Sequence, residues 1–224
     1  QPTRRPRSEP MPLRPLPRKA CERMAQQMLH SAATPEVLAR IVERAAGNPL
    51  WLEELIRAAA EGVHDETPGT VMAMLQARIG QLPGGARQVL RAASVFGETF
   101  WQDGVIALLG QAQREDVTAQ IDVLVGRELF AVHADSRFPH QRELRFRHTL
   151  LRDAAYSLLT EQDQVLGHRL AGAFLQSQGE SDQAVLAEHA RRGQQPERAV
   201  QCYSAAAEGA LSRNDVSAAL RYAR

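Results

Sequence analysis

Lysine is almost absent from this sequence. Lys19 is the sole lysine among 27 lysine and arginine residues. A phosphate-binding loop of the Walker A type needs a lysine after glycine and before serine or threonine, because the ammonium and the backbone amides hold the phosphates together. Lys19 instead stands between Arg18 and Ala20. The 224 residues therefore contain no such loop, and we expect them to hydrolyse no nucleotide by themselves.

Cysteines and long apolar runs are scarce as well. Cys21 and Cys202 lie far apart, without a CxxC motif or a histidine-rich neighbourhood. This pattern predicts neither a disulfide framework nor a zinc site. No apolar run is long enough to span a bilayer, and the N-terminus lacks the apolar core of a signal peptide. We therefore expect a cytoplasmic protein with no metal site and no membrane partner.

Aromatic residues and net charge are low too. Aromatics make up 5% of the chain, and the formal net charge is +1 at pH 7. Such a charge creates no field that would require nucleic acid or an anionic membrane as a partner. Alanine and leucine supply most of the apolar residues, which favours closely packed helices. The composition predicts a mainly α protein, and the length predicts two or three compact units.

Residues 18–66 carry three amphipathic helical patterns. The second helix is expected to begin where Thr34 caps it and Pro35 occupies its first turn. Asn48 and Pro49 repeat this combination at the start of the third helix. The apolar positions of all three recur at the three- and four-residue spacings that share one helix face. The pattern predicts one small helical bundle.

Residues 67–160 have a different plan. Thr67-Pro68-Gly69 is a turn signal, and three or four amphipathic helices follow it. Residues 129–132 and 144–148 then alternate between apolar and polar positions, and the residues between them are polar and include Pro139. This alternation predicts a β-hairpin. Helices followed by a hairpin are the plan of a winged helix, a helix-turn-helix with a hairpin wing.

Residues 161–224 read as helical throughout, with turns at residues 193–195 and 214–215. Alanines and tyrosines recur there at the helix contact spacing, in a pattern similar to tetratricopeptide units that stack into a solenoid. The proline- and arginine-rich residues 1–17 are expected to be extended. Arg224 lies inside an amphipathic run, so we expect the chain to be part of a longer protein.

Three stretches carry a resemblance to a known family: residues 47–55 (GNPLWLEEL), 89–97 (VLRAASVFG) and 146–156 (FRHTLLRDAAY). Together they resemble the half that follows the catalytic core in bacterial STAND-type signal-transduction ATPases, a branch of the AAA-like P-loop proteins. Relatives include the ATPase modules fused to serine/threonine kinases, adenylate cyclases and LuxR-type regulators.

The resemblance implies a role for each segment of the chain. Residues 1–17 would end the missing ATPase core, and residues 18–66 would form a helical lid. Residues 67–160 would be the winged helix, and residues 161–224 the start of tetratricopeptide-like repeats. The implied function is the regulatory part of a nucleotide-switched ATPase. Its expected partners are the P-loop core and a protein or small-molecule effector of the repeats, with a nucleotide-dependent oligomer allowed.

The resemblance also implies a cofactor, ATP or ADP with Mg²⁺ in the missing core, which these residues alone would not bind. Pro49 would lie near the adenine with Asn48 beside it, and His148 would contact the β-phosphate of ADP. Arg147 and Thr149 replace the methionine and aspartate that flank this histidine in the family. Each residue also has a structural explanation, because Asn48 and Pro49 start a helix and His148 alternates in register with interior positions.

We predict no catalytic residue in the chain. The adjacent carboxylates of Glu53 and Glu54 diverge by about 100° on a helix, and favourable charge in the helix's first turn explains them. Neither cysteine has an activating base nearby in the sequence. Any enzymatic activity would therefore belong to the longer protein, and the resemblance implies an ATPase, of a kind that the family also joins to kinases and cyclases.

Two other functions remain open from the sequence. A winged helix can bind DNA, and Arg137, Arg142, Arg145 and Arg147 on the hairpin could contact phosphates. The same arginines could instead pair with acidic neighbours, and the expected recognition helix carries Glu115, Asp116 and Asp122 besides Arg114. The first alternative is therefore a DNA-binding transcription regulator. The second is a scaffold that uses only the tetratricopeptide-like repeats.

Overall fold

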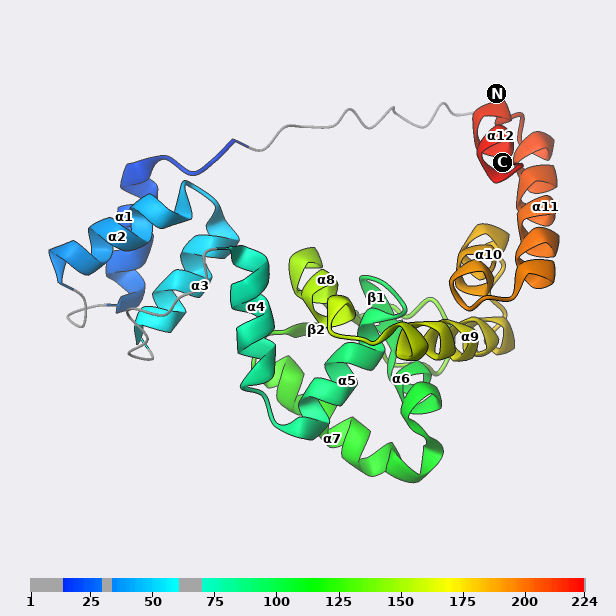
Figure 1. The fold of residues 1–224 in the computed structure, drawn as a ribbon, viewed down its shortest axis with the longest axis horizontal. Helices are drawn as coiled ribbons and strands as arrows, with labels where there is room; N and C mark the ends of the chain where they lie inside the picture. The colour runs from blue at the N-terminus through cyan, green and yellow to red at the C-terminus, as the bar shows by residue number, and fades with distance from the viewer. Residues whose placement is uncertain (1–13, 30–33, 61–69, 224) are drawn as a thin grey trace. The chain divides into compact units, whose positions relative to one another are not determined.

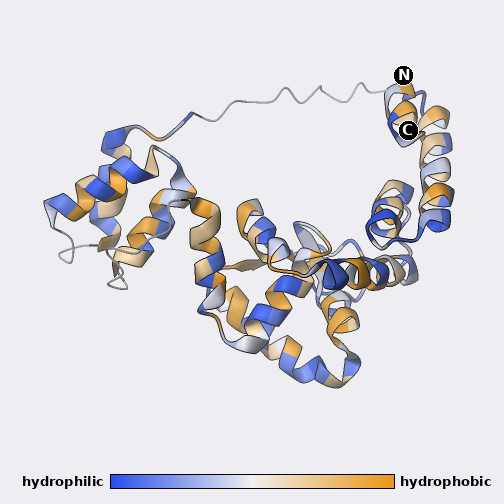
Figure 2. Ribbon diagram, viewed as in Figure 1, coloured by the Kyte–Doolittle hydropathy of each residue, from blue (hydrophilic) through white to orange (hydrophobic). Residues whose placement is uncertain are grey.

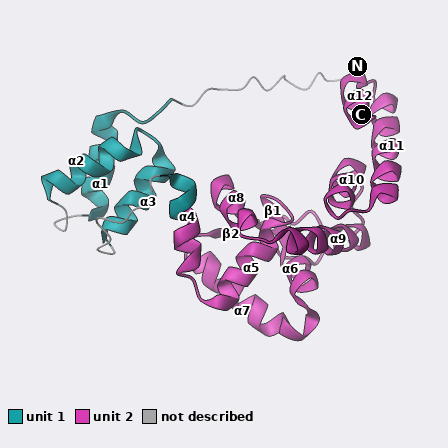
Figure 3. Ribbon diagram, in the orientation of Figure 1, with its two compact units in different colours: residues 1–74 teal, residues 75–224 magenta. Residues whose placement is uncertain are grey.

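The computed structural model describes residues 14–29, 34–60 and 70–223. Within these ranges the chain forms twelve α-helices, one short 3-10 helix and a three-stranded sheet, so the predicted mainly α fold is confirmed (Figure 1). The chain divides into two compact units, residues 1–74 and 75–224 (Figure 3). The predicted linker over residues 1–17 and the turn at residues 67–69 fall largely or wholly outside the described residues.

The first unit contains the three helices expected from the sequence: α1 (Arg18–Leu29), α2 (Pro35–Ala45) and α3 (Pro49–Ala60). The Thr34 side chain accepts a hydrogen bond from the Val37 amide at 3.4 Å and caps α2 as predicted. In α1 and α2 apolar and polar residues separate onto different faces, whereas α3 is apolar over most of its length (Figure 2). Their shared core consists of Cys21, Ala25, Leu29, Ile41, Val42, Ala45, Leu52, Leu55, Ile56 and Met74.

The turn between α2 and α3 requires a glycine. Gly47 has a φ of +77°, and a Cβ added there would lie 2.7 Å from the Cβ of Pro15 and 2.8 Å from the carbonyl oxygen of Leu16. The Leu16 amide donates to the Gly47 carbonyl at 2.8 Å. The segment that precedes α1 therefore lies against this turn, and any larger residue at position 47 would push it away.

The second unit begins within α4 and alternates helices with the short strands of one sheet. Its first elements are α4 (Val71–Gly80), α5 (Gly84–Ser94), β1 (Thr99–Trp101), α6 (Gln102–Leu109), the 3-10 helix η2 (Gln111–Gln113), α7 (Arg114–Gly126), β2 (Phe130–Val132), β3 (Glu143–Phe146) and α8 (Thr149–Ser157).

The sheet has the order β1-β3-β2, and both pairings are antiparallel. The predicted hairpin is thus confirmed as β2 and β3, while β1 was not foreseen. Three phenylalanines pack on one face of this sheet, with ring centroids 4.6 Å apart for Phe100 and Phe130 and 5.0 Å apart for Phe130 and Phe146. Each strand contributes one ring, so the contact among the rings joins all three strands on this face of the sheet.

Four further helices complete the second unit: α9 (Glu161–Ser177), α10 (Gln183–Arg192), α11 (Pro196–Ser212) and α12 (Val216–Tyr222). Each packs against the next, and α9 also packs against α6. The turns expected at residues 193–195 and 214–215 separate α10 from α11 and α11 from α12. These helices belong to the same compact unit as the sheet, so their separation as a domain of residues 161–224 stays a prediction.

No helix within the described ranges combines the length and the apolar character that crossing a membrane requires.

Gly104 in α6 gives a direct test of this packing. A Cβ added there would lie 2.8 Å from Cζ of Phe96 and 3.0 Å from Cε1 of Phe174. These two rings are packed edge to face and cannot both retreat easily. We expect Gly104→Ala to lower the free energy of unfolding by about 1–3 kcal/mol, measured by urea denaturation followed by circular dichroism.

Gly126→Ala is the matched control, because a Cβ added at this helical glycine meets no atom within 4 Å. We expect this control to be neutral or to stabilise the protein by up to about 1 kcal/mol. Equal stability of the two variants would contradict the packing described for α6.

Candidate functional site

Asn48 and Pro49, two of the predicted nucleotide contacts, lie at the start of α3. The Asn48 side-chain oxygen accepts a hydrogen bond from the Trp51 amide at 3.2 Å, and Pro49 is the first helical residue. Both residues are exposed. They therefore perform the capping role that the sequence also allowed.

His148, the third predicted contact, directly precedes α8. Its backbone is extended, and its carbonyl accepts a hydrogen bond from the Leu151 amide at 3.1 Å. The residue is half-buried and lies beyond the end of β3. Asn48 and Pro49 belong to the first compact unit and His148 to the second. Their meeting around a nucleotide therefore stays a prediction.

The two adjacent carboxylates on α3 have different surroundings. Glu53 accepts a hydrogen bond from Arg57 at 3.1 Å, whereas Glu54 is buried with 5% exposure. The explanation offered from the sequence was wrong in one respect, because the first turn of α3 contains no acidic residue. Glu53 is instead explained by its ion pair with Arg57, one helical turn further along the chain.

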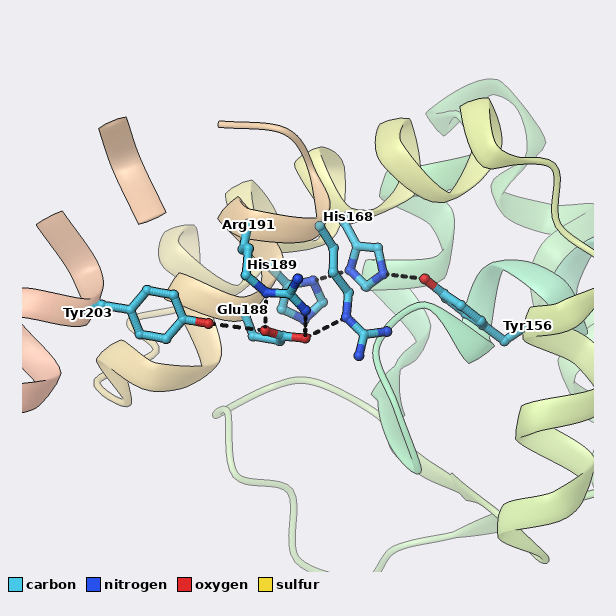
Figure 4. Close-up of polar contacts among 7 residues, drawn as sticks. Tyr156, His168, Glu188, His189, Arg191 and Tyr203 are labelled. Carbon is cyan, nitrogen blue, oxygen red and sulfur yellow. Dashed lines mark hydrogen bonds and ion pairs between the residues drawn. The ribbon is translucent and has the colours of Figure 1, made fainter. Parts of the chain in front are cut away.

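A polar network that sequence reasoning missed connects helices α8 to α11 (Figure 4). The Tyr156 hydroxyl lies 2.9 Å from Nε2 of His168, and Nδ1 of His168 lies 3.0 Å from Nδ1 of His189. Each step leads to the next helix in the chain. We call this network the α8–α11 relay. It comprises Tyr156, His168, Glu188, His189, Arg191, Arg192 and Tyr203.

The two histidines of the relay are buried, with exposures of 4% and 5%. Burial, reinforced by the neighbouring His189 and Arg192, lowers the pKa of His168 to about 3. Burial and the nearby Arg192 cation lower the pKa of His189 to about 4. Both rings are therefore neutral at pH 7. One Nδ1 must carry a proton and donate a hydrogen bond to the other, because two bare nitrogens 3.0 Å apart would repel each other.

Glu188 connects the relay to α11 and remains ionised. Arg191 donates two hydrogen bonds to its carboxylate, at 2.9 and 2.8 Å, and the Tyr203 hydroxyl donates a third at 3.1 Å. The Arg191 hydrogen bonds, aided by those of Arg192 and Tyr203, lower the pKa of Glu188 to about 2. The Arg192 guanidinium lies 5.9 Å from the centroid of the Tyr156 ring, so α10 also contacts α8 directly.

The relay is suited to holding helices in register. Burial of both histidines denies them to a substrate, and the single carboxylate among these residues is already shared by three side chains. In the described part of the chain, no group of three or more histidine, cysteine, aspartate or glutamate residues is arranged to hold a metal ion. These contacts instead connect α10 and α11 to α8.

The sequence offered a faint signal for this site. His168 and His189 stand 21 positions apart and form no spaced motif. Each is, however, the one polar residue on the buried face of its helix, among small residues: Gly167, Ala171 and Gly172 around the first, and Ala187 and Ala190 around the second. Buried polar side chains need partners, so two such positions on successive helices could have been paired.

Comparison with known proteins yields one significant similarity among curated sequences. An uncharacterized protein of Rhizobium meliloti (strain 1021) is 31% identical over 198 residues, which cover 82% of this chain and 19% of that protein. The chain thus spans about a fifth of the relative's length. No protein-family model matches, and no solved structure matches. Family and activity are therefore argued from the residues of the chain itself.

The lowered histidine pKa values predict how stability changes with pH. Between pH 6.5 and about 4 the unfolded chain binds protons that the folded relay excludes. Stability is therefore fully present above pH 6.5 and falls as the pH is lowered through this window, by about 1 kcal/mol per pH unit for each histidine. Below pH 4.5 protonation of Glu188 adds to the loss.

Urea denaturation at pH 7, 6 and 5 would measure this dependence. His189→Gln retains a hydrogen-bonding side chain but removes one titrating ring, so we expect the slope with pH to fall by about half. The exposed His140, which has a φ of 64°, provides the control His140→Asn, because asparagine tolerates this backbone conformation. An unchanged slope in His189→Gln would contradict the assignment.

Proposed function

We propose that this chain is the regulatory part of a nucleotide-switched signal-transduction ATPase. Residues 18–66 would act as a helical lid and residues 67–160 as a winged helix, both gating a nucleotide site in a separate P-loop core. Residues 161–224 would receive the signal, a protein or small molecule, as tetratricopeptide-like repeats. The sequence resemblance motivates the proposal, and the order of elements in the second unit carries it.

That order is helix, strand, helix, helix, strand, strand, from α5 to β3. The strands form one antiparallel sheet in which β3 lies between β1 and β2. In the proposed module α6 and α7 are the helix-turn-helix pair, and β2 and β3 are the hairpin wing. The order supports a winged helix because β1, which the sequence did not reveal, adds a third strand that ties the wing to the helices.

The C-terminal helices support the sensing part of the proposal. Helices α9 to α12 pack successively, as stacked repeats require, and the α8–α11 relay joins three of them to α8. An effector that favours one arrangement of these helices would bias the module before them, because binding shifts an equilibrium by its differential affinity for two states. The relay gives that coupling a physical route.

ADP or ATP, with Mg²⁺ in the core, is the proposed cofactor. The residues here fit contacts to a nucleotide: Pro49 presents an exposed apolar ring, Asn48 is an exposed polar residue beside it, and His148 is half-exposed. Pro49 and Asn48 would line the adenine side, and His148 would donate to a phosphate. The cofactor would supply the switch between an ADP-bound and an ATP-bound state, while these residues would contribute to the affinity for the nucleotide.

The test uses the longer protein that contains this chain together with a P-loop core. We expect Pro49→Ala and His148→Ala each to weaken ADP binding by about tenfold, the loss of about 1.4 kcal/mol of contact energy. Isothermal titration calorimetry would measure this, with the exposed His133→Ala as the matched control. Wild-type ADP affinity and basal signalling in both variants would refute the nucleotide contacts. Turnover of ATP by the 224 residues alone would refute the whole proposal.

DNA binding is the alternative, and the ion pairs of the second unit weigh against it. Arg142 pairs with Asp122 at 2.7 Å and Arg147 with Glu128 at 3.3 Å. Arg114, at the start of α7, pairs with Asp103 at 2.8 Å, and two further acids occupy the first turn of this helix. These cations already have anionic partners, so phosphates would have to compete for them.

A gel-shift experiment with the 224-residue chain distinguishes the two functions. We expect no shift of duplex DNA at any salt concentration between about 50 and 200 mM. A shift that is lost steeply with added salt, and that weakens in a variant of the exposed hairpin arginine, Arg145→Ala, would favour the DNA-binding alternative.

A further inference from the structure

The loop between β2 and β3, residues 133–142, reaches the C-terminal helices with two neighbouring side chains, Arg137 and Phe138. We call this segment the hairpin loop. It holds neither a predicted nucleotide contact nor a residue of the α8–α11 relay. Among the C-terminal helices, the contacts of these two side chains fall on α9, on α10 and on the turn that joins them.

Arg137 forms an ion pair with Glu180, which lies in the turn between α9 and α10. The Glu180 side chain is 1% exposed, whereas that of Arg137 is 48% exposed. The same Glu180 oxygen accepts a hydrogen bond from the amide of Asp182 at 2.7 Å, and Asp182 caps α10. Removal of Arg137 would leave a buried carboxylate without its counter-charge, which strongly disfavours the closed arrangement.

Phe138 fills an aromatic cluster beside this ion pair. It is 4% exposed, and its ring centroid lies 4.7 Å from that of Trp101 in β1. The remaining buried members of the cluster come from α9 and α10: Phe174, Leu175 and Leu186. Phe138 therefore joins the sheet to both helices, and its departure would open a cavity among them.

Glu143 in β3 fixes the loop from the other side. Its Oε2 accepts a hydrogen bond from the backbone amide of Arg137 at 2.7 Å and another from Nε1 of Trp101 at 3.1 Å. The loop therefore leaves the sheet in a set direction, with Arg137 and Phe138 presented together to α9 and α10. The two side chains are adjacent in the chain and share this anchor.

We propose that the hairpin loop is a latch that couples the C-terminal helices to the sheet. In the closed state Arg137 neutralises Glu180 and Phe138 fills the aromatic cluster. In the open state Glu180 and Arg137 are hydrated and Phe138 has left the cluster. Intermediate positions are unfavourable, because they leave either a buried charge unpaired or a cavity unfilled, so the latch has two discrete states.

The latch has a regulatory role only if the proposed function holds. Helices α9 and α10 would then be held to the wing itself, in addition to their link with α8 through the relay. An effector that displaced the turn at Glu180 would release the hairpin loop, and it would change the environment of the strand that leads to His148. The experiment below is made on the chain alone, so its outcome is separate from that of the ADP measurement.

Hydrogen–deuterium exchange of the 224-residue chain tests the latch. Arg137→Ala should raise the exchange rates of residues 178–186 and of the hairpin loop by about tenfold or more, because opening replaces two buried contacts. Glu180→Gln should raise them less, since the amide keeps a hydrogen bond. Arg142→Ala is the matched control: it removes another ion pair of the same loop, but its partner Asp122 lies on α7.

A double variant tests whether Arg137 and Glu180 act through their contact with each other. If Arg137 acts through Glu180, then Arg137→Ala combined with Glu180→Gln should exchange no faster than Arg137→Ala alone. Phe138→Leu, a milder change than Phe138→Ala, should produce the same regional pattern while preserving the fold. The latch is refuted if Arg137→Ala alters exchange at residues 178–186 no more than Arg142→Ala does, or if the two single effects simply add.

Discussion

The buried contact between His168 and His189 is the constraint on which the C-terminal half of the chain depends. The two Nδ1 atoms lie 3.0 Å apart, and at pH 7, where both rings are neutral, one of them donates a hydrogen bond to the other. Tyr156 satisfies the far nitrogen of His168, and the neighbouring Glu188 gathers two arginines and Tyr203. These contacts hold α8 to α9, α9 to α10 and α10 to α11, because each helix supplies a hydrogen-bond partner for a side chain of the next.

This constraint gives the proposed regulator its rigidity. Apolar contacts between alanine-rich helices tolerate sliding, since one small side chain resembles the next. Directed hydrogen bonds do not, because a shift of one residue would leave a buried polar atom without a partner. A signal received at α10 or α11 would therefore move these helices together with α8. The hairpin loop would add a second connection, from the same helices to the sheet.

Much of the fold could be read from local patterns. Thr34 with Pro35, and Asn48 with Pro49, marked two helix starts because capping depends on a few adjacent residues. The strand Thr99–Trp101 escaped notice because three residues cannot display a period, and its pairing with β3 depends on residues more than 40 positions later. The relay was hidden for the same reason: each histidine looks unremarkable until the fold brings its partner near.

The histidine pair also leaves the relay without a fixed direction. In one arrangement Tyr156 donates to His168, and His168 donates to His189; in the other, His189 donates to His168, and His168 donates to Tyr156. Both use the same heavy-atom positions, but a change from one to the other moves a proton between the two ring nitrogens of each histidine, so protons must be exchanged with solvent at the ends of the relay. A change of charge near either end would favour one orientation. The direction of the hydrogen bonds in the relay is therefore decided by the charges around it and not by the positions of the helices.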